Sequence, residues 1–163
     1  MPIIVEDGTG LETAETYVSV VTADAYHSAY GNTAWAAALT AAKEAALRRA
    51  AQYIDSRYRF RGSPITTTQA LSFPRYIFHD ATDEWPISRL TAATCELALR
   101  ALTDNLYTDQ TDRSVTRETV GPLTIEYAQP QRGGQVRFAV VDDLLSPLTL
   151  GSGRLTMRLE RAS

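Results

Sequence analysis

One stretch of the chain, residues 41–59, carries the strongest helical signal and constrains the rest of the fold. Its apolar residues recur every three or four positions, which is the spacing of one buried helical stripe. Gly62 and Pro64 follow and end the helix. Several stripe positions, among them Ala46 and Ala50, are small and allow a second helix to approach closely. We therefore expect a helix over 41–59 at the centre of a packed group of helices.

A second helical pattern covers residues 88–107. Its apolar stripe is wide, so this helix should contact neighbours on more than one side. We expect its Leu97 and Ala101 to face Ala46 and Ala50 of the first helix. Acidic and basic side chains four residues apart predict surface ion pairs on both helices: Glu44 with Arg48, Asp55 with Arg59, and Glu96 with Arg100.

The remaining pattern predicts smaller elements around these two helices. We expect a short helix over 23–31, an extended segment over 71–75, and a hairpin of 115–120 with 123–127. A short helix follows around 141–145, and then a Gly-Ser-Gly linker leads to a segment in which apolar and polar residues alternate. The predicted fold class is mainly α: a small helical bundle with two long central helices, a short β-hairpin and an extended C-terminal arm. A single domain divides into a helical part, 1–150, with the hairpin near 115–127, and an arm, 151–163.

Composition and motifs point away from an enzyme. No apolar run approaches the roughly 20 residues needed to span a bilayer, and one cysteine fits a reducing cytoplasm. His79 lies beside Asp80, Asp83 and Glu84, which we interpret as a solvated polar loop rather than a metal site. Cys95 lies in the apolar second helix, where a buried thiol is inert. We expect no catalytic residue, no cofactor and no metal.

Four arginines form a local basic cluster in an otherwise acidic chain. Arg57, Arg59 and Arg61 precede Gly62, and Arg75 follows the Phe-Pro pair. Aromatic residues alternate with them in the sequence: Tyr58, Phe60, Phe73 and Tyr76. Phosphate pairing and base stacking would make this a DNA contact, whereas a solvated helix end is the simpler interpretation. The formal net charge of −3 and the pI near 5.4 weigh against a dedicated nucleic-acid binder.

The C-terminal arm is the second candidate binding segment. Leu155, Met157 and Leu159 alternate with polar residues, and Arg154, Arg158 and Arg161 outnumber Glu160. A strand with one apolar face can bind a partner protein by adding to the edge of its sheet or by placing that face in an apolar groove. Alternatively, it pairs with the hairpin of its own chain. The hairpin tip, Gly121 and Pro122, is a further expected contact with a partner.

An ordered set of short matches also resembles a known family. In chain order, the set consists of Tyr17-Val-Ser-Val, Ala23-Asp-Ala-Tyr26, Trp35, Lys43-Glu-Ala-Ala-Leu-Arg-Arg-Ala50, Tyr53-Ile-Asp55, Gln69-Ala-Leu-Ser-Phe-Pro-Arg75, the Ile87 helix with Glu96-Leu-Ala-Leu99, Val120-Gly-Pro122 with Glu126-Tyr127, and Asp143-Leu-Leu-Ser-Pro-Leu148. It is similar to the head–tail adaptor (connector, head-completion) proteins of tailed bacteriophages. Related sequences carry the label of primosomal single-strand DNA-binding proteins, so the alternative is a single-stranded-DNA-binding module of a phage replication system.

The adaptor resemblance implies a structural role without catalysis. It implies a ring of about twelve neighbouring subunits, bound to the portal protein and docking the next neck or tail protein. Double-stranded DNA would pass through the ring without sequence specificity. The protein would be made in the host cytoplasm and reside in the neck of the virion, and no membrane would be involved.

Overall fold

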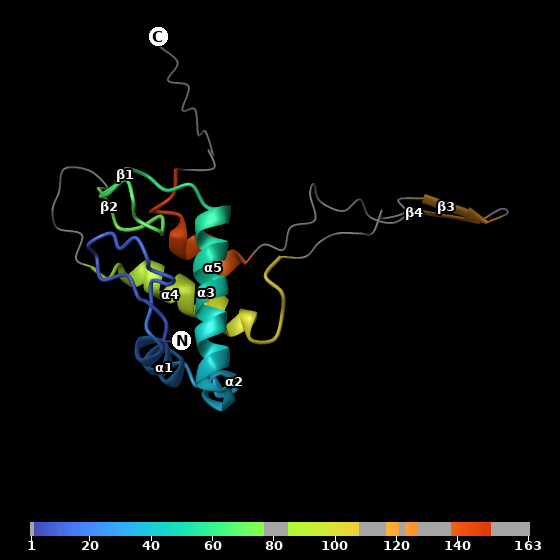
Figure 1. The fold of residues 1–163 in the computed structure, drawn as a ribbon. Helices are drawn as coiled ribbons and strands as arrows, with labels where there is room; N and C mark the ends of the chain where they lie inside the picture. Colours follow the sequence, from blue (N-terminus) through green and yellow to red (C-terminus); the bar gives the residue numbers. More distant parts are fainter. Residues whose placement is uncertain (1, 77–84, 108–116, 121–122, 127–137, 151–163) are drawn as a thin grey trace, which may run out of the picture.

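The computed structural model describes residues 2–76, 85–107, 117–120, 123–126 and 138–150 (Figure 1). Within these residues lie five helices and two two-stranded antiparallel ribbons, so the predicted mainly α fold is confirmed. The predicted C-terminal arm, 151–163, lies outside the described residues. The elements in chain order are α1 (Val20–Ala29), α2 (Thr33–Ala37), α3 (Thr40–Arg57), β1 (Ser63–Pro64), β2 (Arg75–Tyr76), α4 (Ser88–Ala101), β3 (Arg117–Val120), β4 (Leu123–Glu126) and α5 (Ala139–Leu145).

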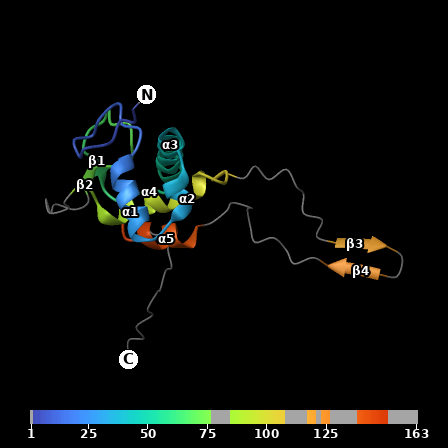
Figure 2. The same ribbon diagram turned by 90° about the horizontal axis from the view of Figure 1, so that it is seen from below.

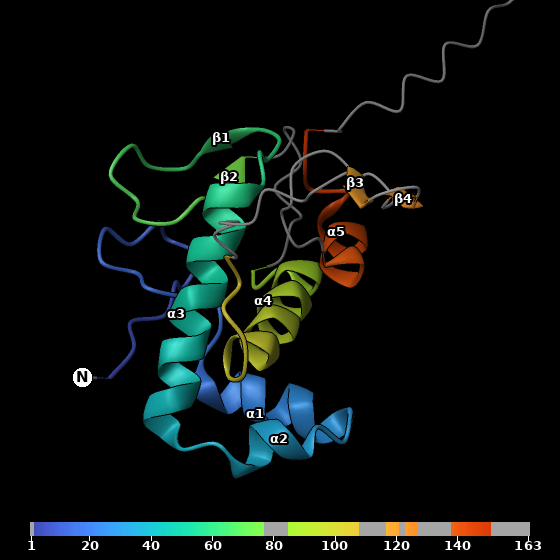
Figure 3. The same ribbon diagram turned by 90° about the vertical axis from the view of Figure 1, so that its right-hand side faces the viewer.

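The long helix α3 is the centre of the arrangement, as its sequence pattern predicts. It runs the height of the helical group in Figure 1, with α1 and α2 at its beginning and the ribbon β1–β2 near its end. Figure 3 shows α4 packed along α3, with α5 beyond α4. Seen along the axis of α3 in Figure 2, the other helices gather on one side of it.

The core lies between α3 and α4. The side chains of Ala46, Ala50, Leu97 and Ala101 are all buried, as expected for residues where two helices meet. Arg49 of α3 also donates from Nη1 to the carbonyl oxygen of Ala101 at 3.1 Å, which satisfies one of the free carbonyls at the end of α4.

Local side-chain hydrogen bonds move the boundaries of two helices from their predicted positions. The second helix ends at Ala101 rather than at residue 107, because Thr103 donates to the carbonyl of Arg100 and Asn105 accepts from the N–H of Tyr107. Such bonds offer the backbone an alternative to the helix. The short helix expected over 23–31 begins at Val20 as α1, because the hydroxyl of Ser19 caps it by accepting from the N–H of Thr22 at 3.1 Å.

Two of the three predicted ion pairs form. Arg48 lies 4.0 Å from Glu44, and Arg100 lies 2.9 Å from Glu96. Asp55 forms no ion pair with Arg59 and instead accepts hydrogen bonds from the Tyr17 hydroxyl and from the backbone N–H of Ser72. Its position in the sequence fits a surface pair, but its partners come from two distant segments.

The predicted hairpin is present, and a second ribbon accompanies it. Strands β3 and β4 pair with Val120 opposite Leu123, and Figure 1 shows them standing away from the helices. The intervening Gly121 and Pro122 lie outside the described residues. The ribbon β1–β2, which the sequence pattern does not predict, pairs Ser63 with Tyr76. No helix among the described residues is long and apolar enough to cross a membrane.

Candidate nucleic-acid interface

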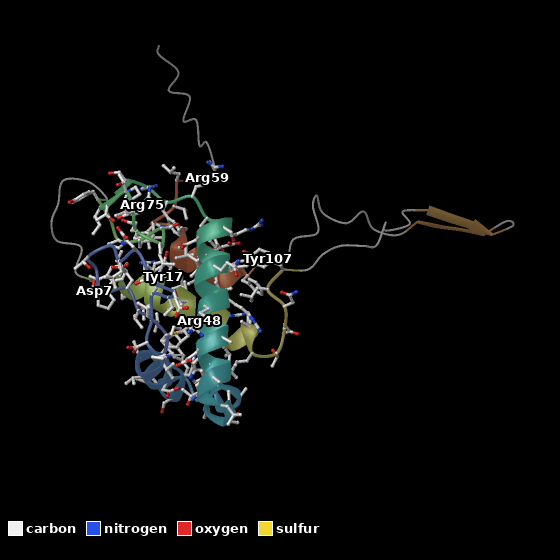
Figure 4. The ribbon with its side chains drawn as sticks, viewed as in Figure 1. Asp7, Tyr17, Arg48, Arg59, Arg75 and Tyr107 are labelled. Atoms are coloured by element: carbon white, nitrogen blue, oxygen red, sulfur yellow. The ribbon has the colours of Figure 1, made fainter. Side chains whose placement is uncertain are left out.

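The end of α3 brings the four predicted arginines to one end of the molecule. Arg57 is the last residue of α3, Arg59 and Arg61 follow in an extended segment, and Arg75 begins β2. Figure 4 shows Arg59 and Arg75 at the same end of α3, far from its beginning. The ribbon β1–β2 folds the chain back, so that Arg75 returns to the segment that carries Arg61.

A short backbone pairing determines the direction in which the side chains of Arg59 and Arg61 point. The N–H of Arg61 donates to the carbonyl of Leu148 at 3.0 Å, and the N–H of Leu150 donates to the carbonyl of Arg59 at 2.8 Å. Side chains alternate between the two faces of an extended segment. Phe60 is therefore buried in the core, while Arg59 and Arg61 lie on the opposite, outer face.

Arg61 and Arg75 are held in place by neutral backbone carbonyls. Arg61 donates from Nε to the carbonyl of Thr149 at 2.8 Å. Arg75 donates from Nε to the carbonyl of Arg61 at 2.8 Å, from Nη2 to that of Gly62 at 2.6 Å and from Nη1 to that of Ser72 at 3.2 Å. These bonds fix the guanidinium groups without neutralising their charge.

The cluster as a whole has no ion-pair partner among the described residues. The side chains of Arg57 and Arg59 have no hydrogen bond or ion pair within that part of the chain, and neither Arg61 nor Arg75 lies within 4.0 Å of a described carboxylate. Nearer the beginning of α3, by contrast, Lys43 lies 2.8 Å from Asp24 and Arg48 lies 3.0 Å from Glu15. The end of α3 is thus a basic site on a protein that is acidic as a whole.

Most of the interleaved aromatic residues are structural. Phe60 and Phe73 are buried, with ring centres 4.7 Å apart. Tyr58 is half-buried and its hydroxyl donates to Asp142 at 2.6 Å. Burial and the neighbouring Asp142 carboxylate raise the pKa of this phenol above its usual value. Of the four rings only Tyr76, which is 65% exposed, is free to stack on a base.

A hollow of about 470 Å³ lies beside the arginines. Asp55 and Arg75 line it together with the loop that connects β1 to β2, including Gln69 and Ser72. Burial raises the pKa of the Asp55 carboxyl, and the hydrogen bonds from Tyr17 and Ser72 oppose that rise. The pattern of the sequence does not reveal this hollow, because Asp55 fits the pattern of a solvent-facing residue of α3.

Neither Cys95 nor His27 is part of a reactive site among the described residues. Cys95 is fully buried, and burial raises the pKa of its thiol to about 12, so it stays protonated and unreactive at neutral pH. His27 is buried against Trp35. No group of three or more potential metal ligands occurs in the described part of the chain. The polar loop with His79, Asp80, Asp83 and Glu84 lies outside it.

The residues of the arm and the hairpin tip that were expected to bind a partner lie outside the described residues: Arg154, Leu155, Met157, Arg158, Leu159, Gly121 and Pro122. The described chain ends at Leu150, which is hydrogen-bonded to Arg59. The arm therefore begins next to the basic cluster.

Comparison with known proteins corrects the assignment made from the sequence. A protein-family model described as "Putative DnaT-like ssDNA binding protein" matches residues 1–162. No curated protein and no solved structure matches the chain. The head–tail adaptor assignment is wrong, and so are the partners that it implied: the portal protein, neighbouring ring subunits, the next neck or tail protein and passing double-stranded DNA.

The reason for that error lies in the short matches themselves. None of them is specific when taken singly, and they fit two labels, of which the family match supports the alternative, a single-stranded-DNA-binding module. The location in the virion neck followed from the adaptor assignment. Because the family model covers almost the whole length, the chain belongs to the family of DnaT-like single-stranded-DNA-binding proteins.

Proposed function

We propose that this protein binds single-stranded DNA at the end of α3, without catalysis. The observation that carries the proposal is the group of four arginines that has no ion-pair partner among the described residues. Phosphate groups are the natural partners of such guanidinium groups, because they can accept two parallel hydrogen bonds. Arg57 and Arg59 are free to pair with phosphates, while Arg61 and Arg75 supply fixed positive charge.

Single strands are favoured over duplex DNA by the exposed ring of Tyr76. Tyr76 lies opposite Ser63 in the β1–β2 ribbon and directly follows Arg75 in the chain. Unpaired bases stack on such rings, whereas the bases of a duplex are already stacked on one another. A strand whose phosphates follow the arginines can therefore place a base on this tyrosine.

The proposal also covers the place and manner of action. The family description names binding and no reaction, and the one cysteine of the chain is buried and unreactive. We place the protein in the cytoplasm, a compartment in which a thiol stays reduced.

Fluorescence anisotropy with a labelled dT oligonucleotide, measured over a range of salt concentrations, tests this proposal. For single strands, the logarithm of the binding constant falls with the logarithm of salt by about 0.7 for each phosphate contact. The double variant R57Q/R59Q should therefore bind more weakly and lower this slope by about 1.4. The side chains of Arg57 and Arg59 make no hydrogen bond or ion pair within the described residues, so the thermal midpoint of the variant should stay unchanged.

Arg89→Gln provides the matched control. Arg89 is an exposed cation in the first turn of α4, outside the cluster, and its replacement should leave the slope unchanged.

Tyr76→Ala should weaken binding to the single strand and leave any binding to duplex DNA unaffected. Equal affinity of R57Q/R59Q and the unmodified protein for the oligonucleotide would contradict the proposed interface.

A further inference from the structure

We propose that the hollow lined by Asp55 and Arg75 binds one guanine base of the DNA strand, an inference that rests on the proposed function. The hollow has a volume of about 470 Å³, which lies in the range of small-molecule sites. It shares Arg75 with the basic cluster, so a strand whose phosphates contact the arginines has a base within reach of it.

Asp55 supplies the hydrogen-bond acceptors of the hollow. One of its carboxylate oxygens accepts from the Tyr17 hydroxyl, and the other accepts from the N–H of Ser72 at 3.1 Å. The Ser72 hydroxyl also lies within hydrogen-bonding reach of this carboxylate. A carboxylate can accept about four bonds in all, so Asp55 keeps acceptor capacity for a ligand. The two existing bonds come from different segments and hold the carboxylate in a fixed orientation.

Arg75 supplies the donors. Three backbone carbonyls take one N–H each from Nε, Nη1 and Nη2. A guanidinium group has five N–H donors, so two remain available. The positive charge of Arg75 also offsets the negative charge of Asp55, which lowers the cost of keeping the carboxylate ionised in a half-buried position.

The remaining wall consists of a saturated amide, apolar residues and the hydroxyl-bearing residues Ser63, Thr66, Thr67 and Ser72. Gln69 donates from its amide to the carbonyls of Leu71 at 2.7 Å and Pro74 at 3.1 Å, and accepts from the N–H of Thr66 at 3.2 Å. It shapes the loop and has little capacity left to select a ligand. Pro64, Ala70 and Leu71 also line the hollow and offer apolar surface to the face of a base.

This combination of donors and acceptors matches guanine better than the other bases. The Watson–Crick edge of guanine has an acceptor, O6, beside two donors, N1–H and the N2 amino group. Arg75 can donate to O6 while the two Asp55 oxygens accept from N1 and N2. Thymine has one donor between two acceptors, and adenine and cytosine each present one amino donor next to an acceptor nitrogen, so none of them offers two adjacent donors to the carboxylate.

Binding of three oligonucleotides by fluorescence anisotropy tests the inference. The first is all dT, the second has one central dG in the dT strand, and the third has deoxyinosine, which lacks the N2 amino group, in place of that dG. We expect the dG strand to bind about tenfold more tightly than all dT, the size of effect seen for good two-bond base contacts. The inosine strand should fall between them.

Two exposed threonines of the same loop give a matched pair of variants. Thr67 lines the hollow and Thr68 does not. Thr67→Phe should fill the hollow and abolish the preference for dG while all-dT binding persists, and Thr68→Phe should keep the preference. Asp55→Asn should also abolish the preference for dG. Its thermal midpoint is measured to show that the variant is folded.

The oligonucleotides and variants of this experiment distinguish a failure of this inference from a failure of the function on which it rests. If the unmodified protein fails to bind all dT, the proposed function is overturned. If it binds all dT and dG strands equally, or if Thr67→Phe keeps the dG preference, the single-strand function stands and the guanine site is overturned.

Discussion

His27 is a buried imidazole with an incomplete set of hydrogen bonds. Its Nδ1 lies 3.0 Å from the Asn32 amide nitrogen, its ring lies 4.5 Å from that of Trp35, and its Nε2 has no hydrogen-bond partner in the described part of the chain. Burial lowers the pKa of His27, with Lys43 acting in the same direction. Glu96, Asp24 and the carbonyl of Cys95 oppose it. The folded protein therefore keeps His27 neutral under conditions in which the unfolded chain binds a proton.

This predicts a loss of stability in mild acid. Because the folded pKa lies below the unfolded value of about 6.5, the contribution of His27 is complete above that pH and is lost as the pH falls below it. Thermal midpoints measured between pH 7.5 and 5 should fall more steeply for the unmodified protein than for His27→Phe, which keeps a ring beside Trp35. Parallel curves would show that another group is responsible for the acid sensitivity.

Glu6 is a buried carboxylate that organises the loop after the first few residues. Its Oε1 accepts from the N–H groups of Gly8 at 2.9 Å and Gly10 at 2.8 Å, and its Oε2 accepts from the N–H of Leu11 at 2.9 Å. Gly10 has a φ of 78° and Thr66 packs against it, so a side chain at this position would meet both backbone strain and a clash. The loop is thereby joined to the segment between β1 and β2.

Glu6→Gln should destabilise the protein by about 1–3 kcal/mol, because an amide NH₂ would face backbone donors that need an acceptor. Urea denaturation monitored by circular dichroism measures the loss. Asp7→Asn is the control, since Asp7 is an exposed neighbour bonded to Thr9, and its midpoint should stay near that of the unmodified protein. Equal midpoints for the two variants would show that the loop does not depend on the carboxylate.

At the scale of elements, the two long helices were predictable and the ribbon that builds the site was not. Apolar spacing depends on neighbours three and four residues apart, so α3 and α4 are visible in the sequence. The β1–β2 ribbon depends on the Arg75 guanidinium bonded to the carbonyls of Arg61 and Gly62, which lie 14 and 13 residues away in the chain. The four arginines could be named from the sequence, but not the acceptor role of Asp55 beside them.

The α3–α4 contact gives a prediction at this scale. Ala50 is fully buried on α3, so Ala50→Leu should overpack the contact and cost roughly 1–3 kcal/mol. Ala42→Leu places the same side chain on an exposed position of the same helix, and its thermal midpoint should change little. An unchanged midpoint for Ala50→Leu would mean that the alanine stripe does not form the contact.

At the scale of the whole molecule, charge is unevenly distributed. The chain has a formal net charge of −3, yet the end of α3 has four arginines without a described carboxylate partner. Leu150, the last described residue, is paired with Arg59, and the following residues 151–163 contain three further arginines and one glutamate. In the chain these residues directly follow the pairing of Leu150 with Arg59.

The arm should extend the DNA contact through its charge rather than its apolar residues. The variant R154Q/R158Q/R161Q should weaken binding to the dT oligonucleotide and lower the salt slope by up to about 2, at about 0.7 for each phosphate that an arginine no longer neutralises. The variant L155S/M157S/L159S keeps all three charges and should bind as the unmodified protein does. If the serine variant binds more weakly and the glutamine variant does not, the arm acts through its apolar face. A large fall in the melting temperature of the serine variant would show instead that this face packs against the rest of the chain.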